Sequence, residues 1–230
     1  GLMIWGCTSQ KKEDTTKEEE RVLDFEQKII DEDLGGRTAI GDIDGDGIND
    51  VVLHTWGSER GVVADGSVTW FKSPDMTKTV IAENEKIFGD GVVVHDVDGD
   101  NINDVVICKG NDQTAEIYWC RNDGNPGEPL WEQHFVARID DESEVKDVEV
   151  HDMDDDGKVD IVVRTKHRFC VFFQDSPDDW FLKQETSRER EGMTLGDLDR
   201  DGDYDVVMNG FFYENPGDPR GNEWPLHVID

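Results

Sequence analysis

The chain has 230 residues, of which 55 are acidic and 23 are basic, so its formal net charge at pH 7 is -32. Nucleic acids and anionic bilayers repel such a protein, because binding to them depends on basic side chains that displace counterions from phosphates. Hydrophobic residues make up 35% of the chain and include seven tryptophans and ten phenylalanines. This is enough apolar material to bury a core, which excludes an acidic disordered tail.

A short apolar segment that ends at a cysteine opens the chain. Residues 1–7, GLMIWGC, are too short to span a membrane and precede a polar, charged run. They resemble the end of a bacterial lipoprotein signal peptide, in which a small residue precedes the cysteine that becomes lipidated. On this interpretation Cys7 carries the lipid, residues 1–7 are the remnant of the signal peptide, and residues 8–21 form a charged flexible tether. The alternative is a cysteine in a tag or tail.

Four segments with one shared pattern follow, and their first aspartates are 45 to 56 residues apart: Asp42, Asp96, Asp152 and Asp197. In each segment an acidic loop lies between two short apolar strands, and an aromatic-rich strand and a fourth strand come after it. This predicts an all-β protein of antiparallel meanders, with no helix downstream of residue 30. Because one meander cannot bury both faces of its sheet, neighbouring units must stack as a propeller or a solenoid. The repeat region is predicted to span residues 22–230, with units at about 38–87, 88–145, 146–191 and 192–230.

The acidic loops carry aspartates at positions 1, 3, 5 and 9. Position 6 is glycine in three loops and Asn101 in the second, and both residue types accept the left-handed backbone of a sharp turn. Calcium takes about six to eight oxygen ligands, which alternating carboxylates and a backbone carbonyl at position 7 can supply. Solvated Asp/Gly turns are the alternative. The residues predicted to hold four structural calcium ions are Asp42, Asp44, Asp46, Ile48, Asp50, Asp96, Asp98, Asp100, Ile102, Asp104, Asp152, Asp154, Asp156, Lys158, Asp160, Asp197, Asp199, Asp201, Asp203 and Asp205.

The pattern D-x-D-x-D-G-x-x-D before an apolar strand resembles the FG-GAP or VCBS repeat of bacterial secreted proteins and integrin alpha subunits. The resemblance covers residues 38–230, and the segment FFYENPGDPRGNEWPLHVI is most similar to bacterial extracellular members. It implies a β-propeller of four-stranded antiparallel blades with structural calcium. Such propellers commonly have seven and sometimes eight blades, so four visible units are expected to be part of a larger ring. A complete four-bladed ring is the alternative. The segment VLDFEQKIIDED, ahead of the first unit, resembles a fourth strand.

The rim opposite the acidic loops is expected to hold a ligand, by analogy with other propellers. Trp56 can stack on a sugar ring, and the basic run RTKHR supplies Arg164, Lys166 and Arg168 for an anionic group such as a uronate or sulfate. The alternatives are a packing tryptophan and a solvated hairpin that balances nearby acids. Cys108 and Cys120, in two consecutive strand-like runs, are either a disulfide or buried thiols.

The favoured function is a calcium-stabilised, monomeric module of the cell envelope that binds a polysaccharide or protein ligand. It is expected to be extracytoplasmic, at the bacterial outer membrane or cell surface, with no nucleic-acid partner and with membrane contact only through the lipid anchor. The alternative is a polysaccharide lyase, because some lyases of acidic polysaccharides are similar propellers. In that case His54, or His167 with Arg164, would supply the base and the positive charge.

Overall fold

The computed structural model describes residues 2–9, 23–31, 35–55, 65–86, 91–110, 114–140, 145–187 and 191–229. These residues form β-strands and no helix, so the all-β prediction is confirmed. Accordingly, no helix among them is long and apolar enough to cross a membrane. The chain divides into two compact units, residues 1–36 and residues 37–230.

The first unit is a two-stranded antiparallel sheet. Strand β1 (Leu2–Ser9) pairs with β2 (Leu23–Asp31), with Cys7 opposite Phe25. The segment ahead of the first repeat is therefore a strand, as its pattern predicts, but its partner is β1 and not a strand of a blade. Residues 8 and 9 of the predicted tether belong to β1, and residues 10–21 lie outside the described residues. The lipoprotein interpretation of residues 1–7 stays a prediction.

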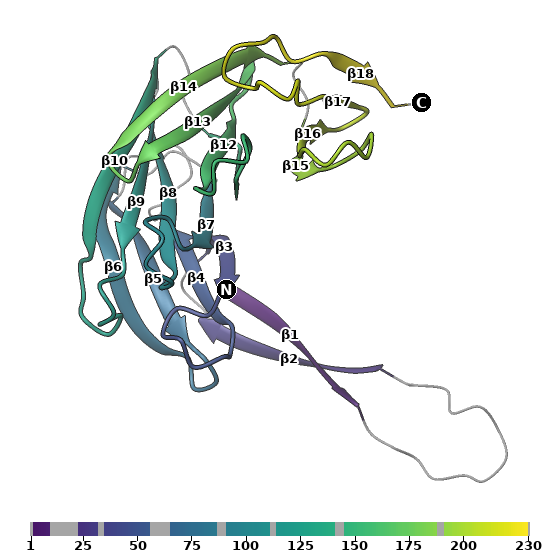
Figure 1. Ribbon diagram of the computed structural model, residues 1–230. Helices are drawn as coiled ribbons and strands as arrows, with labels where there is room; N and C mark the ends of the chain where they lie inside the picture. Colours follow the sequence, from purple (N-terminus) through teal and green to yellow (C-terminus); the bar gives the residue numbers. More distant parts are fainter. Residues whose placement is uncertain are drawn as a thin grey trace, which may run out of the picture. The chain divides into compact units, whose positions relative to one another are not determined.

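The second unit contains four sheets of four antiparallel strands, each in chain order (Figure 1). We call them blades 1 to 4. Their strands are β3 (Gly36–Gly41), β4 (Asp50–Thr55), β5 (Asp65–Lys72) and β6 (Thr77–Lys86); β7 (Val92–His95), β8 (Asp104–Gly110), β9 (Thr114–Arg121) and β10 (Glu132–Asp140); β11 (Asp147–His151), β12 (Asp160–Arg164), β13 (Arg168–Ser176) and β14 (Asp179–Thr186); β15 (Met193–Gly196), β16 (Asp205–Met208), β17 (Phe211–Tyr213) and β18 (Leu226–Val228). The prediction of four-stranded antiparallel propeller blades is confirmed, and the number of blades in a ring stays a prediction.

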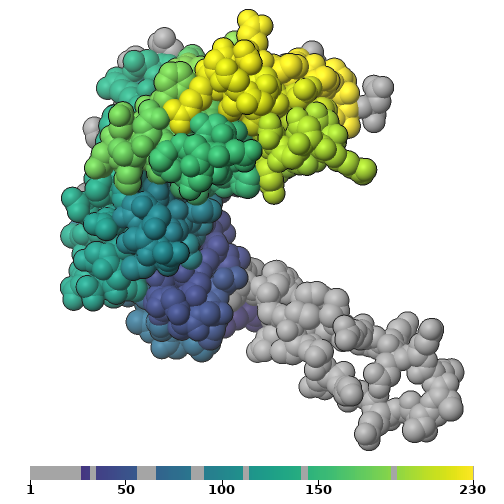
Figure 2. Space-filling view, in the orientation of Figure 1, coloured from purple at the N-terminus to yellow at the C-terminus, as the bar shows by residue number. Residues whose placement is uncertain are grey.

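The four blades follow one another in chain order (Figure 2), and their inner strands are in contact, β4 with β7, β7 with β11, and β11 with β15. The second strand of a blade is an uninterrupted apolar run because both of its faces are covered. Successive side chains of a strand point to opposite faces. In β8, Val105 and Ile107 therefore pack against blade 1, whereas Val106 and Cys108 pack against blade 3.

The cysteines follow the same alternation. Cys108 belongs to the core between blades 2 and 3, and Cys120 to the core between blades 1 and 2. In the antiparallel register Cys108 lies opposite Ile117, and Cys120 lies opposite Val105. Both are buried and form no disulfide, and the same holds for Cys170, so the disulfide alternative is wrong.

A buried carboxamide fastens each blade to the one before it. Asn122, directly after β9, donates from Nδ2 to the carbonyl of Ile43 in the first acidic loop, at 2.8 Å. The equivalent bonds join Gln174 Nε2 to the Val97 carbonyl at 2.9 Å and Asn215 Nδ2 to the Met153 carbonyl at 2.8 Å. Each bond satisfies a backbone carbonyl that the packing of blades removes from water. The position of each of the first three acidic loops is thereby tied to the next blade.

Candidate metal centres

The first aspartate of each loop folds the loop around itself. Asp42 Oδ1 accepts hydrogen bonds from the backbone N–H groups of Gly45 and Asp46 at 2.8 and 3.1 Å, and its Oδ2 accepts from Gly47 at 2.8 Å. Gly47 has a φ of 84° and its counterpart Asn101 a φ of 67°, so position 6 has the left-handed backbone expected from the sequence. The local sequence alone therefore determines this turn.

The folded loop brings three carboxylates together in every blade. One oxygen from each of the three lies within 4.8 Å of the others. In the first three loops the group comes from positions 1, 3 and 9, and in the fourth from positions 1, 3 and 5. The groups are Asp42, Asp44 and Asp50; Asp96, Asp98 and Asp104; Asp152, Asp154 and Asp160; and Asp197, Asp199 and Asp201.

The other predicted ligands have different partners. The carboxylate at position 5 accepts a hydrogen bond from the backbone N–H at position 7, as Asp46 does from Ile48 and Asp100 from Ile102, both at 2.9 Å. Lys158 and Asp203 donate in the same way to Asp156 and Asp201. Metal binding by the position 7 carbonyls stays a prediction.

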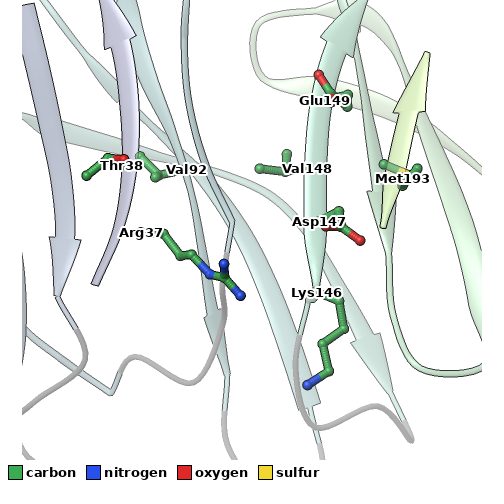
Figure 3. A pocket seen from close by; sticks show the side chains of 8 residues that line it. All are labelled: Arg37, Thr38, Val92, Lys146, Asp147, Val148, Glu149 and Met193. Carbon is green, nitrogen blue, oxygen red and sulfur yellow. The ribbon is translucent and has the colours of Figure 1, made fainter. Parts of the chain in front are cut away.

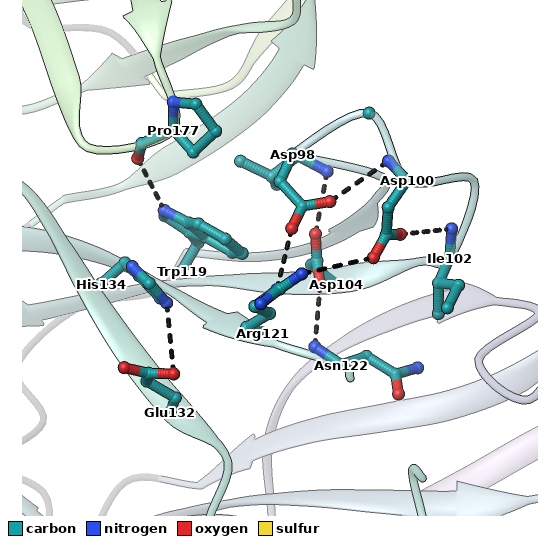
Figure 4. Close-up of polar contacts among 12 residues, drawn as sticks. Asp98, Asp100, Ile102, Asp104, Trp119, Arg121, Asn122, Glu132, His134 and Pro177 are labelled. Carbon is teal, nitrogen blue, oxygen red and sulfur yellow. Dashed lines mark hydrogen bonds and ion pairs between the residues drawn. The ribbon is translucent and has the colours of Figure 1, made fainter. Parts of the chain in front are cut away.

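The aspartate at position 9 has a structural role that the spacing alone does not indicate. Asp104 Oδ2 accepts from the backbone N–H of Val97 at 3.0 Å. Its Oδ1 accepts from the backbone N–H of Asn122 at 2.8 Å (Figure 4). Asp50, Asp160 and Asp205 each bridge the same two places in their blades, the loop start and the end of the third strand. Burial raises the pKa of Asp104 to about 7.

Basic side chains lie against the first three groups. Arg121, at the end of β9, donates from Nε to Asp98 at 2.8 Å and lies 3.7 Å from Asp100 (Figure 4). Lys72, at the end of β5, pairs with Asp44. In the third loop the cation comes from the next blade, because Arg220 Nε donates to Asp154 at 2.6 Å. In the described part of the chain, no salt bridge reaches the carboxylates of the fourth loop.

The oxygen atoms of these loops fit a hard divalent cation. Asp44 Oδ1 and Asp154 Oδ1 are buried and have no hydrogen-bond donor among the described residues. Such oxygens cost free energy unless a cation or a donor satisfies them. Carboxylate oxygens are the ligands that calcium and magnesium prefer, and three of them converge in each loop. Several aspartate clusters can therefore hold metal ions, as the sequence predicts.

The residues predicted to form the ligand rim are not all at the surface. Arg164 is 2% exposed, and its Nε donates to Asp147 Oδ2 at 2.5 Å. His54 is buried in β4, whereas Lys166 and His167 are exposed in the turn after β12. The remaining basic residue of the run, Arg168, donates to Gln184 Oε1 at 2.8 Å. Trp56 lies outside the described residues.

A pocket of about 160 Å³ lies at the rim opposite the acidic loops, where the inner strands start (Figure 3). All four blades contribute to it. Its lining residues are Arg37, Thr38, Val92, Lys146, Asp147, Val148, Glu149 and Met193. None of these was a candidate from the sequence. In the sequence these residues share only one feature: each lies in the first strand of a unit or just ahead of it.

Comparison with known proteins supports the repeat. Residues 96–163, from the second acidic loop to β12, match a family model described as FG-GAP-like repeat. This segment is therefore similar to an FG-GAP-like repeat, and the resemblance seen in the sequence is confirmed there.

One solved structure that the chain matches is the biofilm matrix protein Bap1 of V. cholerae. The similarity has a TM-score of 0.49 and a sequence identity of 15%, and it covers 83% of this chain and 31% of that one. The chain thus spans about a third of the length of that protein. No curated protein matches this chain.

Proposed function

We propose that the chain is a calcium-stabilised FG-GAP-repeat module of the cell envelope that binds a polysaccharide or protein ligand at the rim opposite its acidic loops. The observation that carries this proposal is that the two rims hold different features. On one rim, backbone N–H groups and basic side chains hold the carboxylates in place around candidate metal sites. On the other, four blades form a pocket with charged and apolar walls.

Calcium would supply positive charge at the loops, and the chain's own residues would hold it. The aspartates at positions 1, 3 and 9 of the first three loops converge within 4.8 Å. Their mutual repulsion opposes folding until a cation offsets it, so binding of the metal would contribute to the stability of the fold. The loops also carry the carbonyls to which the next blade is fastened, so an ordered loop orders the junction between blades.

A binding module is favoured over a lyase by the surroundings of the three candidate catalytic residues. Arg164, needed to stabilise negative charge, is buried and already paired with Asp147 and Glu191. His54 is buried in β4 of blade 1, whereas His167 is exposed in blade 3. A lyase needs its base and its positive group within reach of one sugar residue.

The test is a binding screen of the purified full chain, with calcium, against acidic and neutral polysaccharides and against envelope proteins. Saturable binding with no new ultraviolet absorbance from unsaturated sugars is the expected result. Turnover that disappears in His167→Ala would replace the binding module by the lyase. Absence of any ligand across the screen would contradict both functions.

Attachment through Cys7 has its own test. In a bacterial host, the chain expressed behind a complete lipoprotein signal peptide should incorporate labelled fatty acid and fractionate with membranes. Cys7→Ser should abolish both, because the thioether to the lipid forms only on that sulfur. Equal labelling of the two proteins would contradict the anchor.

A further inference from the structure

We propose that Arg220 is a positioning residue for the third metal loop, so that cation binding in blade 3 depends on a side chain from blade 4. This inference rests on the calcium-stabilised module proposed above, and it names the residue that couples one metal site to a junction between blades. Arg220 lies in the connection between β17 and β18, residues 214–225, and was not a candidate from the sequence.

A basic side chain forms ion pairs with the aspartates at positions 3 and 5 in each of the first three loops. The three sets are Lys72 with Asp44 and Asp46, Arg121 with Asp98 and Asp100 (Figure 4), and Arg220 with Asp154 and Asp156. In the first two loops the basic residue ends the third strand of its own blade, directly ahead of the residue whose backbone N–H donates to the position 9 aspartate. The equivalent residue of blade 3, directly ahead of Gln174, is Phe173. The guanidinium of Arg220 lies over the Phe173 ring, 5.1 Å from its centroid, so blade 4 supplies the basic group that blade 3 lacks at this place.

The ion pair holds the position 3 carboxylate by one oxygen and leaves the other oxygen for a cation. Arg220 Nε donates to Asp154 Oδ2 at 2.6 Å, whereas Asp154 Oδ1 is buried and has no donor in the described part of the chain. The first loop repeats this arrangement, because Lys72 pairs with Asp44 Oδ2, and Asp44 Oδ1 is buried without a donor among the described residues. A bound cation would satisfy such an oxygen. Loss of a side chain that fixes a metal-binding carboxylate typically weakens metal affinity about 10–100-fold.

The charge of Arg220 is offset by a carboxylate outside the loop. Arg220 Nη1 donates to Asp175 Oδ1 at 2.6 Å, so one guanidinium joins Asp154 and Asp175. The rings of Phe173 and Phe181, with centroids 5.1 and 5.9 Å from the guanidinium carbon, stabilise it in this place. A lone positive charge beside the loop would repel a divalent cation, and Asp175 reduces that repulsion. The main effect of Arg220 on the site is therefore the orientation of Asp154.

The connection that carries Arg220 is anchored to blade 3 at two further points. Asn215 Nδ2 donates to the Met153 carbonyl in the third loop at 2.8 Å. Trp224 is 4% exposed and packs against Phe169 of β13, with 5.6 Å between the ring centroids. Arg220 is thus held on both sides in the chain. By thermodynamic linkage, cation binding at the third loop and docking of this connection stabilise each other by the same free energy.

The first test compares the free energy of unfolding of the full chain in urea at one fixed calcium concentration and in chelator. Arg220→Gln should cost more stability in calcium than in chelator, because it removes the ion pair and also weakens the third metal site. In isothermal titration calorimetry with calcium, one site of Arg220→Gln should bind at least about tenfold more weakly. Arg220→Lys, which keeps the charge, should recover part of this loss. Arg138→Gln, which removes an exposed arginine paired with Asp140, is the matched control and should leave calcium affinity unchanged.

The second test uses a variant of the carboxylate through which Arg220 acts. In an Asp154→Asn background, the effect of Arg220→Gln on calcium affinity should disappear, because the oriented carboxylate is already lost. An equally large effect in both backgrounds overturns the inference.

The outcomes separate this inference from the proposed function. An equal cost of Arg220→Gln in calcium and in chelator identifies an ordinary ion pair and overturns the inference. Tighter calcium binding by Arg220→Gln identifies a competitor of the cation and overturns it as well. If the wild-type chain neither binds calcium nor gains stability from it, the calcium-stabilised module and this inference both fail. If the wild type responds to calcium and Arg220→Gln binds it equally well, only this inference fails. Should Arg220→Gln not fold, Arg220→Lys carries the same comparison.

Discussion

Replacing Asn122 by alanine tests the junction between blades. The side chain is 1% exposed, and its Nδ2 donates to the Ile43 carbonyl at 2.8 Å and to the Asn103 carbonyl at 3.2 Å. Its Oδ1 accepts from the backbone N–H of Gly124 at 3.1 Å. Alanine removes all three bonds and leaves the Ile43 carbonyl without its donor from the second blade.

The expected loss follows from these bonds. A buried polar group left without its partner costs about 1–3 kcal/mol, and each further hydrogen bond contributes about 1 kcal/mol. The bond to Asn103 is longer, and water at the exposed Gly124 replaces part of what that residue loses, so the net destabilisation should be about 2–4 kcal/mol. In a domain of this size 1 kcal/mol corresponds to roughly 2–4 °C. The melting temperature should therefore fall by about 5–15 °C.

Urea unfolding followed by tryptophan fluorescence, in saturating calcium, measures this loss. Asn125→Ala is the matched control, because Asn125 is an exposed asparagine in the same turn whose hydrogen bonds to other described residues use only its backbone. It should change the free energy of unfolding by less than about 0.5 kcal/mol. A loss below about 0.5 kcal/mol in Asn122→Ala as well would show that the carboxamide bond does not hold blades 1 and 2 together.

Four further predictions concern the metal loops, a half-buried carboxyl group and a thiol. Chelation of calcium should lower the melting temperature by many degrees in scanning calorimetry, and an unchanged melting curve would exclude structural metal. Asp50→Ala should cost about 2–4 kcal/mol even after chelation, because Ile43 and Ser73 lose their acceptor, whereas the cost of Asp44→Ala should lie mainly in the calcium-dependent part of the stability. Burial, and secondarily the Asp147 charge, raises the pKa of Glu149, so its ionisation opposes folding. The free energy of unfolding of Glu149→Gln, relative to that of the wild type, should therefore rise as the pH is raised from 4 to 7 in urea titrations. A fall over this range would contradict the raised pKa. Burial also raises the pKa of the Cys108 thiol, which should react with a thiol reagent only after unfolding.

Local sequence determined the strands and the loops. The 45- to 56-residue repeat of aspartates, apolar runs and aromatic runs predicts each meander, because strand pairing between neighbouring segments needs only short connections. The left-handed position 6 is equally local, since only the residue type at Gly47 or Asn101 decides whether the turn is strained. The candidate metal groups follow from these two features. The local sequence pattern also predicted strand β2, but it did not indicate that β2 pairs with β1.

Only the tertiary structure decided which side chains meet across blades. Asn122 and the Ile43 carbonyl are 79 residues apart in sequence, and Arg220 reaches Asp154 across 66 residues. The basic run at Arg164 shows the same limit of prediction from sequence, because this candidate ligand-binding residue is buried and forms an internal ion pair with Asp147. The pocket needs the first strands of four units at once. The periodicity of apolar residues specifies which face of a strand is buried. The contacts between blades depend instead on how one blade is rotated and translated against the next. The spacing of residues within a blade does not encode that arrangement.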